Sequence, residues 1–215
     1  KDSGTTNGLL NSAVEGFKQT WRQLLKMWQD KDKRRFLIAY LIYEDGINTV
    51  ITFSSIFAAT TLKFKPDELI YMYLMVQATA LTGVFFMARL IDYRGPKYVS
   101  LLSLVLWSII TVTTFFVRDK ILFMLIASVA GLGLGTIQAA TRAFYTQFIP
   151  AGEESEYFGV YNLVGKSSAI LGPVLFGFLS STFGSQRPAV LSVTTFFILG
   201  FVILKTVRGG KPNVT

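Results

Sequence analysis

The chain contains 215 residues, of which 51% are hydrophobic and only 16% are charged. Soluble domains usually carry about 25% charged residues, so this composition and a mean hydropathy of +0.46 exclude an ordinary soluble domain and a disordered chain. The absence of Cys and His excludes disulfides, Cys/His zinc sites, Ser-His-Asp triads and His proton relays. We therefore expect no metal, no cofactor and no enzymatic activity.

The segment 1–35 precedes the first long apolar run and holds eight of the 21 basic residues. Apolar residues recur in it at helical spacing, at Val14, Phe17, Trp21, Leu24, Leu25 and Trp28. Lys18, Arg22 and Lys26 flank this stripe, which predicts an amphipathic helix on a membrane surface with anionic headgroups. A helix that binds a calmodulin-type partner has a similar pattern, but the spans that follow favour the membrane. We therefore assign the net charge of +8 to a membrane surface rather than to nucleic acid.

Six apolar stretches are long enough to cross about 30 Å of hydrocarbon as helices. They are Phe36–Leu62, Leu69–Ile91, Tyr98–Val117, Ile121–Ile149, Tyr157–Phe183 and Pro188–Val207. We predict an all-α, polytopic membrane helix bundle of six transmembrane helices over 36–207, with a cytoplasmic linker at 1–35 and a cytoplasmic tail at 208–215. The lipid bilayer is its first expected partner.

Basic residues are unevenly distributed between the two ends of these spans. Fifteen of them fall on the side that holds both termini, and five fall on the other side. Because cytoplasmic loops carry the excess of Lys and Arg, we expect an integral, multi-pass membrane protein with both termini in the cytoplasm.

Ionisable and polar residues occupy one layer in the cytoplasmic half of the predicted bundle. The ionisable ones are Glu44, Asp45, Arg142 and Lys166, and the polar ones on the same helix faces are Tyr40, Asn48, Gln138 and Asn162. A charge near the bilayer centre costs at least about 2.5–3.5 kcal/mol, so such groups usually face a bundle interior or a cavity. The pattern predicts a layer that responds to substrate and protons, and a structural ion-pair network between helices is the alternative. Because like charges repel, the Glu44/Asp45 pair is a candidate protonation site.

Glycine and proline mark packing faces and a break in the fifth stretch. Pro173 cannot donate a backbone hydrogen bond, so we predict a kink in this span at Gly172-Pro173. Other glycines predict close helix packing; they are Gly131, Gly133, Gly135, Gly165 and Gly177.

The turn between the second and third spans reads Ala88-Arg-Leu-Ile-Asp92-Tyr-Arg94-Gly95-Pro-Lys97. It resembles the signature loop of the major facilitator superfamily, G-x-x-x-D-[RK]-x-G-[RK]-[RK]. The pattern is matched at Asp92, Gly95 and Lys97, and it is not matched at Ala88, Tyr93 and Pro96. An Asp near helix ends can bind backbone N–H groups and a neighbouring Arg. We therefore expect a gating loop formed by Asp92, Arg94, Gly95 and Lys97.

Three further stretches carry a more specific resemblance. They are Tyr40-Leu-Ile-Tyr-Glu-Asp-Gly-Ile-Asn-Thr49, Gln138-Ala-Ala-Thr-Arg142 with Ile149-Pro150, and Glu156-Tyr-Phe-Gly-Val-Tyr-Asn-Leu-Val-Gly-Lys-Ser167 with Leu171-Gly-Pro173. Together they resemble the C-terminal half of the superfamily branch that contains the fungal autophagy-related vacuolar amino-acid effluxers and their bacterial relatives. The resemblance covers about residues 36–205 and implies helices 7–12 of a twelve-helix transporter. The partner it implies is an N-terminal six-helix half, in the same longer polypeptide or in a second subunit, and the start at Lys1 without Met favours the former.

The resemblance implies secondary active transport by alternating access, in which two halves rock around a central site. The implied cargo is amino acids or similar small polar solutes, and proton coupling is an open alternative. We infer that Arg142 or Lys166 binds a substrate carboxylate and that Glu44/Asp45 binds an ammonium group or a proton. A non-transporting scaffold or sensor, and transport of a sugar, drug or lysolipid, are the competing hypotheses. The implied location is the bacterial inner membrane or the eukaryotic vacuolar membrane.

Overall fold

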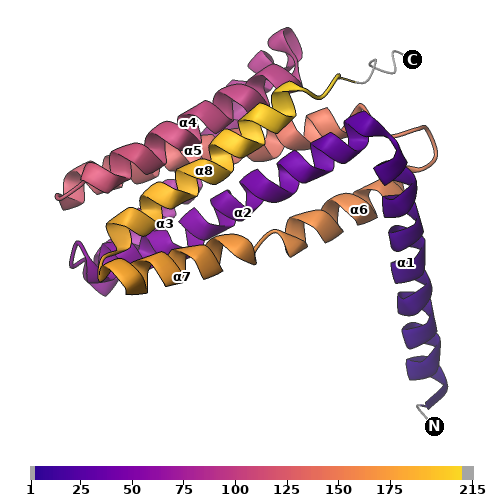
Figure 1. Ribbon diagram of the computed structural model, residues 1–215, viewed down its shortest axis with the longest axis horizontal. Helices are drawn as coiled ribbons and strands as arrows, with labels where there is room; N and C mark the ends of the chain where they lie inside the picture. The colour runs from indigo at the N-terminus through magenta and orange to yellow at the C-terminus, as the bar shows by residue number, and fades with distance from the viewer. Residues whose placement is uncertain (1–2, 210–215) are drawn as a thin grey trace.

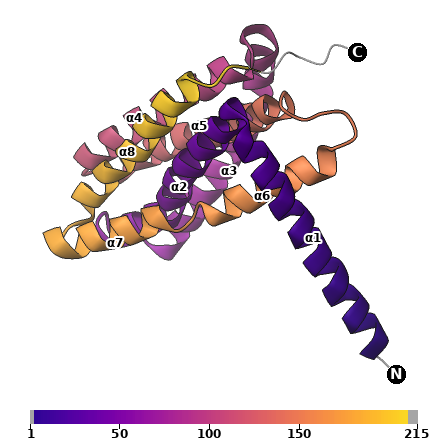
Figure 2. The same cartoon turned by 45° about the vertical axis from the view of Figure 1, so that its right-hand side comes forward.

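The computed structural model describes the backbone of residues 3–209 and the side chains of residues 15–209. Within these residues it contains only helices and their connections (Figures 1 and 2). The helices are α1 (Ser3–Gln29), α2 (Lys31–Thr60), α3 (Pro66–Arg94), α4 (Pro96–Phe116), α5 (Lys120–Thr146), α6 (Glu154–Ser167), α7 (Leu171–Phe183) and α8 (Gln186–Lys205). Val14 of the predicted stripe and residues 210–215 of the predicted tail lie outside the described side chains.

Six segments are long and apolar enough to cross a membrane, and they match the six predicted spans. Five of them are the single helices α2, α3, α4, α5 and α8, and the other is α6 together with α7. The prediction of an all-α bundle with six membrane spans is confirmed. The predicted boundaries are a few residues off, because the observed helices extend into capped polar ends; Asp30, for example, accepts hydrogen bonds from the backbone N–H groups of Asp32 and Lys33 at the start of α2.

The fifth span is broken into two helices, where the sequence predicts one helix with a kink. The helical path is interrupted at 168–170, so that Gly172 and Pro173 lie in the first turn of α7. Proline is tolerated in a first turn, because its missing N–H would have no helical partner there and its ring meets no preceding turn. The break therefore comes before the proline, and the prediction of a kink at Gly172-Pro173 is corrected accordingly.

Helices α3 and α5 approach each other closely at glycines. A Cβ atom at Gly83 would lie 2.5 Å from the Leu132 carbonyl oxygen, and Cβ atoms at Gly131 and Gly135 would overlap the carbonyls of Val76 and Ala80. Gly133 has only ordinary contacts, and a Cβ at Gly177 would have no neighbour within 4 Å. The packing role predicted for Gly177 is therefore not seen, because this residue lies on the exposed side of α7.

Helix α1 meets the bundle at the end where α2 begins; its second half packs on the start of α6, and its first residues project away from the other helices (Figures 1 and 2). The same end holds the α3–α4 connection and the end of α8, because Lys97 Nζ donates to the Lys205 and Val207 carbonyls and Asp32 accepts from the Arg208 N–H. At the opposite end, Arg187 Nη1 donates to the Phe115 carbonyl at 2.6 Å. Both ends of the bundle are thus closed by polar contacts between neighbouring helices.

We predict that Gly135→Ala destabilises the bundle and that Gly177→Ala does not. The first substitution forces α3 and α5 apart, and overpacking of this kind typically costs about 1–3 kcal/mol. The second adds a methyl group in open space at a helical position where Ala is preferred over Gly by roughly 0.5–1 kcal/mol. The thermal unfolding midpoint of each variant in the same detergent measures the difference, and equal midpoints would contradict this account of the α3–α5 contact.

Candidate functional site

Tyr40, Glu44 and Asn48 lie on one side of α2 and face α6. The Tyr40 ring stacks on the Tyr161 ring, with centroids 4.5 Å apart and an angle of 11° between the planes. Asn48 Nδ2 donates to Ser168 Oγ at 3.1 Å, beside the break. Glu44 is half-buried and forms no hydrogen bond with the described residues. On this side of α2, the Glu44 carboxylate therefore lies between an aromatic contact to α6 and a hydrogen bond to the residue after α6.

Asp45 points in another direction and has a different role from Glu44. Its side chain is only 3% exposed, and its Oδ2 accepts a hydrogen bond from the Gly172 N–H at 2.9 Å. The carboxylate thus lies at the start of α7, where the helix dipole favours a negative charge. A Cβ at Gly172 would overlap Thr49 Oγ1 and lie 3.1 Å from Asp45 Oδ1, so α2 and α7 cross closely here. Consecutive residues on a helix face about 100° apart, which separates the carboxylates that the sequence analysis treated as a pair.

Gln138 and Arg142 are exposed on α5 and line an open groove between α5 and α3. The groove has a volume of about 580 Å³, and its third polar residue is Gln77 of α3. Gln77 lies about 16 Å along α3 at 1.5 Å per residue, so it is at membrane depth. Gln77 is not among the residues predicted for the layer, although a lone amide in an apolar run is a signal that the sequence contains.

Tyr161 connects the α5 residues with α2. Its hydroxyl lies within electrostatic reach of both the Glu44 carboxylate and the Arg142 guanidinium. Asn162 and Lys166, on the same helix as Tyr161, are exposed and form no hydrogen bond with the described residues. The structure therefore packs Tyr40 of α2 against Tyr161 of α6, and it leaves Asn162 and Lys166 pointing out of this six-helix unit.

The ion pairs of the described chain lie outside this layer. They are Lys26–Glu153, with 3.2 Å between Nζ and Oε2, and Lys120–Glu68, at 2.5 Å. The layer thus shows no closed ion-pair network among residues 15–209. Exposed Arg and Lys side chains at membrane depth are too costly to face lipid tails. We infer that this face is covered by protein or by water.

The predicted gating loop joins α3 to α4. Gly95 has φ = 84°, a left-handed conformation that favours glycine. Lys97 Nζ donates to the carbonyls of Lys205 and Val207 at 2.9 and 2.6 Å, and the Arg94 guanidinium lies over the rings of its neighbours Tyr93 and Tyr98. Asp92 is exposed and accepts no hydrogen bond from the described residues. In this conformation Lys97, rather than Asp92, connects the loop to the bundle.

We predict that Asp45→Ala lowers stability more than Glu44→Ala does. The first removes a buried hydrogen bond to a charged group, which typically contributes about 1.5–3 kcal/mol. The second removes a side chain that has no hydrogen bond in the described structure. Thermal unfolding midpoints of the two variants in one detergent provide the comparison, and an equal or larger loss for Glu44→Ala would contradict the separation of their roles.

Comparison with known proteins places the chain in one family. The family model described as "Vacuole effluxer Atg22 like" matches residues 3–213. An uncharacterized MFS-type transporter, YxiO of Bacillus subtilis, is 27% identical over 191 residues, which cover 89% of this chain and 44% of that protein. Autophagy-related protein 22 of Vanderwaltozyma polyspora is 28% identical over 199 residues, which cover 84% of this chain and 38% of that protein.

Autophagy-related protein 22 of Saccharomyces cerevisiae is 27% identical over 180 residues, which cover 79% of this chain. The chain spans about two fifths of the length of the curated relatives it matches. No solved structure matches it at comparable significance.

Proposed function

We propose that this chain forms one half of a secondary transporter for amino acids or similar small polar solutes. The chain belongs to the Atg22-like vacuole effluxer family. The family is one of transporters rather than enzymes. The observation that carries the proposal is the polar face at membrane depth, formed by the exposed side chains of Gln138, Arg142, Asn162 and Lys166 and the half-buried side chain of Glu44. A six-helix unit with such a face needs a second protein surface opposite it, and the relatives are long enough to supply one.

The charges on this face suit a zwitterionic solute. Arg142 has a guanidinium that can bind a carboxylate with two parallel hydrogen bonds, and it is exposed toward the groove. Glu44 is the carboxylate without a hydrogen-bond partner in the described residues, so we assign to it the ammonium group or a coupled proton. Lys166 provides a second cation for the solute carboxylate. Asp45 is excluded from solute contact in this proposal, because it is buried against α7.

The broken span provides the moving element for alternating access. Discontinuous helices near the membrane midplane are a recurring feature of transporter sites. Here the solute-facing Lys166 lies near the end of α6, and the contacts of Asn48 and Asp45 hold both sides of the break against α2. A change in the α6–α7 angle therefore moves Lys166 relative to Glu44. The distribution of basic residues orients the α1 end toward the cytoplasm.

We predict that Glu44→Gln and Arg142→Gln reduce solute flux to background without lowering expression. The measurement is uptake of a labelled amino-acid mixture into proteoliposomes that contain the complete two-half transporter, with and without an imposed pH gradient. Arg118→Gln is the matched control, because Arg118 is exposed on the α4–α5 connection, away from the layer. Gradient-dependent flux that is lost in Glu44→Gln establishes proton coupling.

Three outcomes would contradict parts of this proposal. Flux that persists in both variants would remove the polar layer from the solute path. A loss of expression with no measurable flux even in the unmodified protein would favour a scaffold or sensor. If the protein transports other solutes but no amino acid, the proposed cargo is wrong and the proposed transporter function stands.

A further inference from the structure

Helix α1 carries a row of large apolar side chains that nothing in the described chain covers. Phe17, Trp21, Leu25 and Trp28 are 59%, 49%, 52% and 45% exposed, and the rings of Phe17 and Trp21 stack on each other. These four positions lie within a narrow sector of the helix at 3.6 residues per turn. We call them the α1 stripe. Monomeric proteins rarely expose contiguous apolar surfaces of this kind unless the surface binds something.

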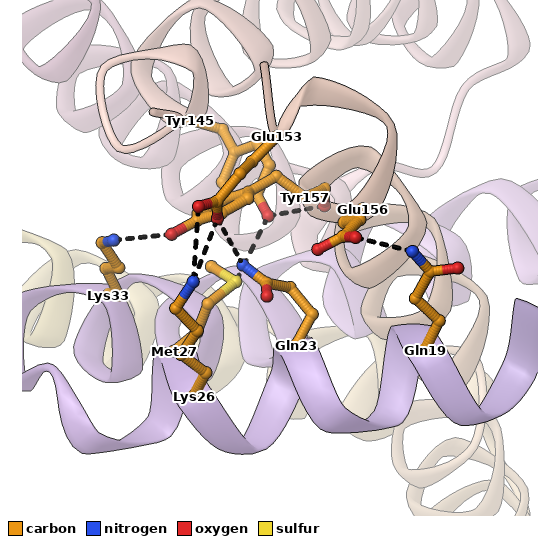
Figure 3. A network of polar contacts seen from close by, with 9 residues as sticks. All are labelled: Gln19, Gln23, Lys26, Met27, Lys33, Tyr145, Glu153, Glu156 and Tyr157. Atoms are coloured by element: carbon orange, nitrogen blue, oxygen red, sulfur yellow. Dashed lines mark hydrogen bonds and ion pairs between the residues drawn. The ribbon is translucent and has the colours of Figure 1, made fainter. Parts of the chain in front are cut away.

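The rotation of α1 is fixed by contacts on its other side (Figure 3). Gln23 and Lys26 both bind Glu153, at 3.2 Å each, and Gln19 Nε2 donates to Glu156 Oε1 at 2.6 Å. Met27 is buried and accepts a long hydrogen bond from Tyr145. We call these contacts, to the start of α6 and to Tyr145 near the end of α5, the α1 clamp. Because the clamp holds one side of α1 against the bundle, the α1 stripe is held outward.

The position of α1 in the fold indicates what covers the stripe. Only Asp30 separates α1 from α2, so α1 lies at the level where the first membrane span begins. A helix that leaves the bundle sideways at this level runs along the membrane surface. Tryptophan and other aromatic side chains are enriched at that depth of a bilayer.

The charges beside the stripe indicate which lipids it meets. Lys18 and Arg22 are exposed on one flank of the stripe and form no ion pair with the described residues, whereas Lys26 is already bound to Glu153. Free basic side chains next to an apolar stripe suit anionic headgroups. The only acidic residue among the described α1 side chains is Glu15, which lies two residues before Phe17, at the N-terminal end of the stripe.

We propose that the α1 stripe inserts into the headgroup region of the membrane leaflet at the α1 end of the bundle, with Lys18 and Arg22 bound to anionic lipids. The α1 clamp then joins this lipid contact to the first turn of α6. The proposal does not depend on the solute that is transported or on whether transport occurs.

The test uses nitroxide labels at single cysteines, which the Cys-free sequence permits. Trp21→Cys and Leu25→Cys place labels on the stripe, and Glu15→Cys and Gln29→Cys place matched labels on exposed positions of α1 beside it. The protein is reconstituted in bilayers of phosphatidylglycerol and phosphatidylcholine, and the accessibility of each label to oxygen and to a polar nickel complex is measured. We expect the two stripe labels to favour oxygen at a depth of about 5–10 Å and the two matched labels to favour the nickel complex.

Two other results would overturn the lipid contact. If the nickel complex reaches the stripe labels, the stripe lies in water. If neither reagent reaches them, the stripe is covered by protein, either the other half or a separate partner. Because a cysteine at Trp21 removes one anchor, the Leu25 label provides an independent measurement with both tryptophans in place.

The lipid preference is tested with Lys18→Gln and Arg22→Gln combined, read through the Leu25 label. We expect the label to lie deeper in anionic than in phosphatidylcholine bilayers, and we expect this difference to vanish in the double variant. Lys205→Gln is the control, because Lys205 is an exposed basic residue at the same end of the bundle but not on α1. Equal depth in the two lipids for the unmodified protein would overturn the pairing with anionic headgroups.

Discussion

The hydrogen bond between Asp45 and the first turn of α7 determines how the polar residues of this bundle are arranged. A membrane span can be interrupted only where the freed backbone groups find partners inside the protein. Asp45 Oδ2 accepts the Gly172 N–H, and Asn48 holds Ser168 on the other side of the break. Gly172 permits this contact, since a Cβ there would overlap Thr49. The two half-helices therefore follow from a short polar stretch of α2.

This use of Asp45 leaves Glu44 as the free carboxylate of the layer. Two adjacent acids with no separation of roles would repel each other inside a low-dielectric bundle. In the structure they face different partners, because Asp45 lies against a helix N-terminus and Glu44 faces the tyrosines of α2 and α6. The helix dipole and the Gly172 N–H offset part of the cost of burying Asp45, whose Oδ1 has no hydrogen-bond partner among the described residues. Glu44 has no such partner in the described residues, which is what a site for a cation or a proton requires.

The sequence predicted the six spans, because hydropathy needs no tertiary information, and from the depth of the charges along each span it indicated a polar layer, which stays a prediction. It could not predict which side chains are used structurally. Asp45 and Glu44 are equivalent by pattern, and only the crossing of α2 and α7 distinguishes them. From Gly172-Pro173 the sequence predicted a bend in the fifth span, but it could not predict that the span divides into two helices with the proline in the first turn of the second. The predicted packing role of Gly177 is not seen either, because it depends on which face of α7 is covered, and the sequence does not show that.

Helix α6 is held at both ends, and this limits how the polar face can change shape. At its start, Glu153 and Glu156 hold α1, whose stripe faces away from the bundle. At its end, Ser168 is bound to Asn48, and the next helix is bound to Asp45. A rotation of α6 that moves Lys166 must therefore strain either the contact with α1 or the contact with α2. The lipid-facing helix and the polar face are thus mechanically connected through a single half-helix.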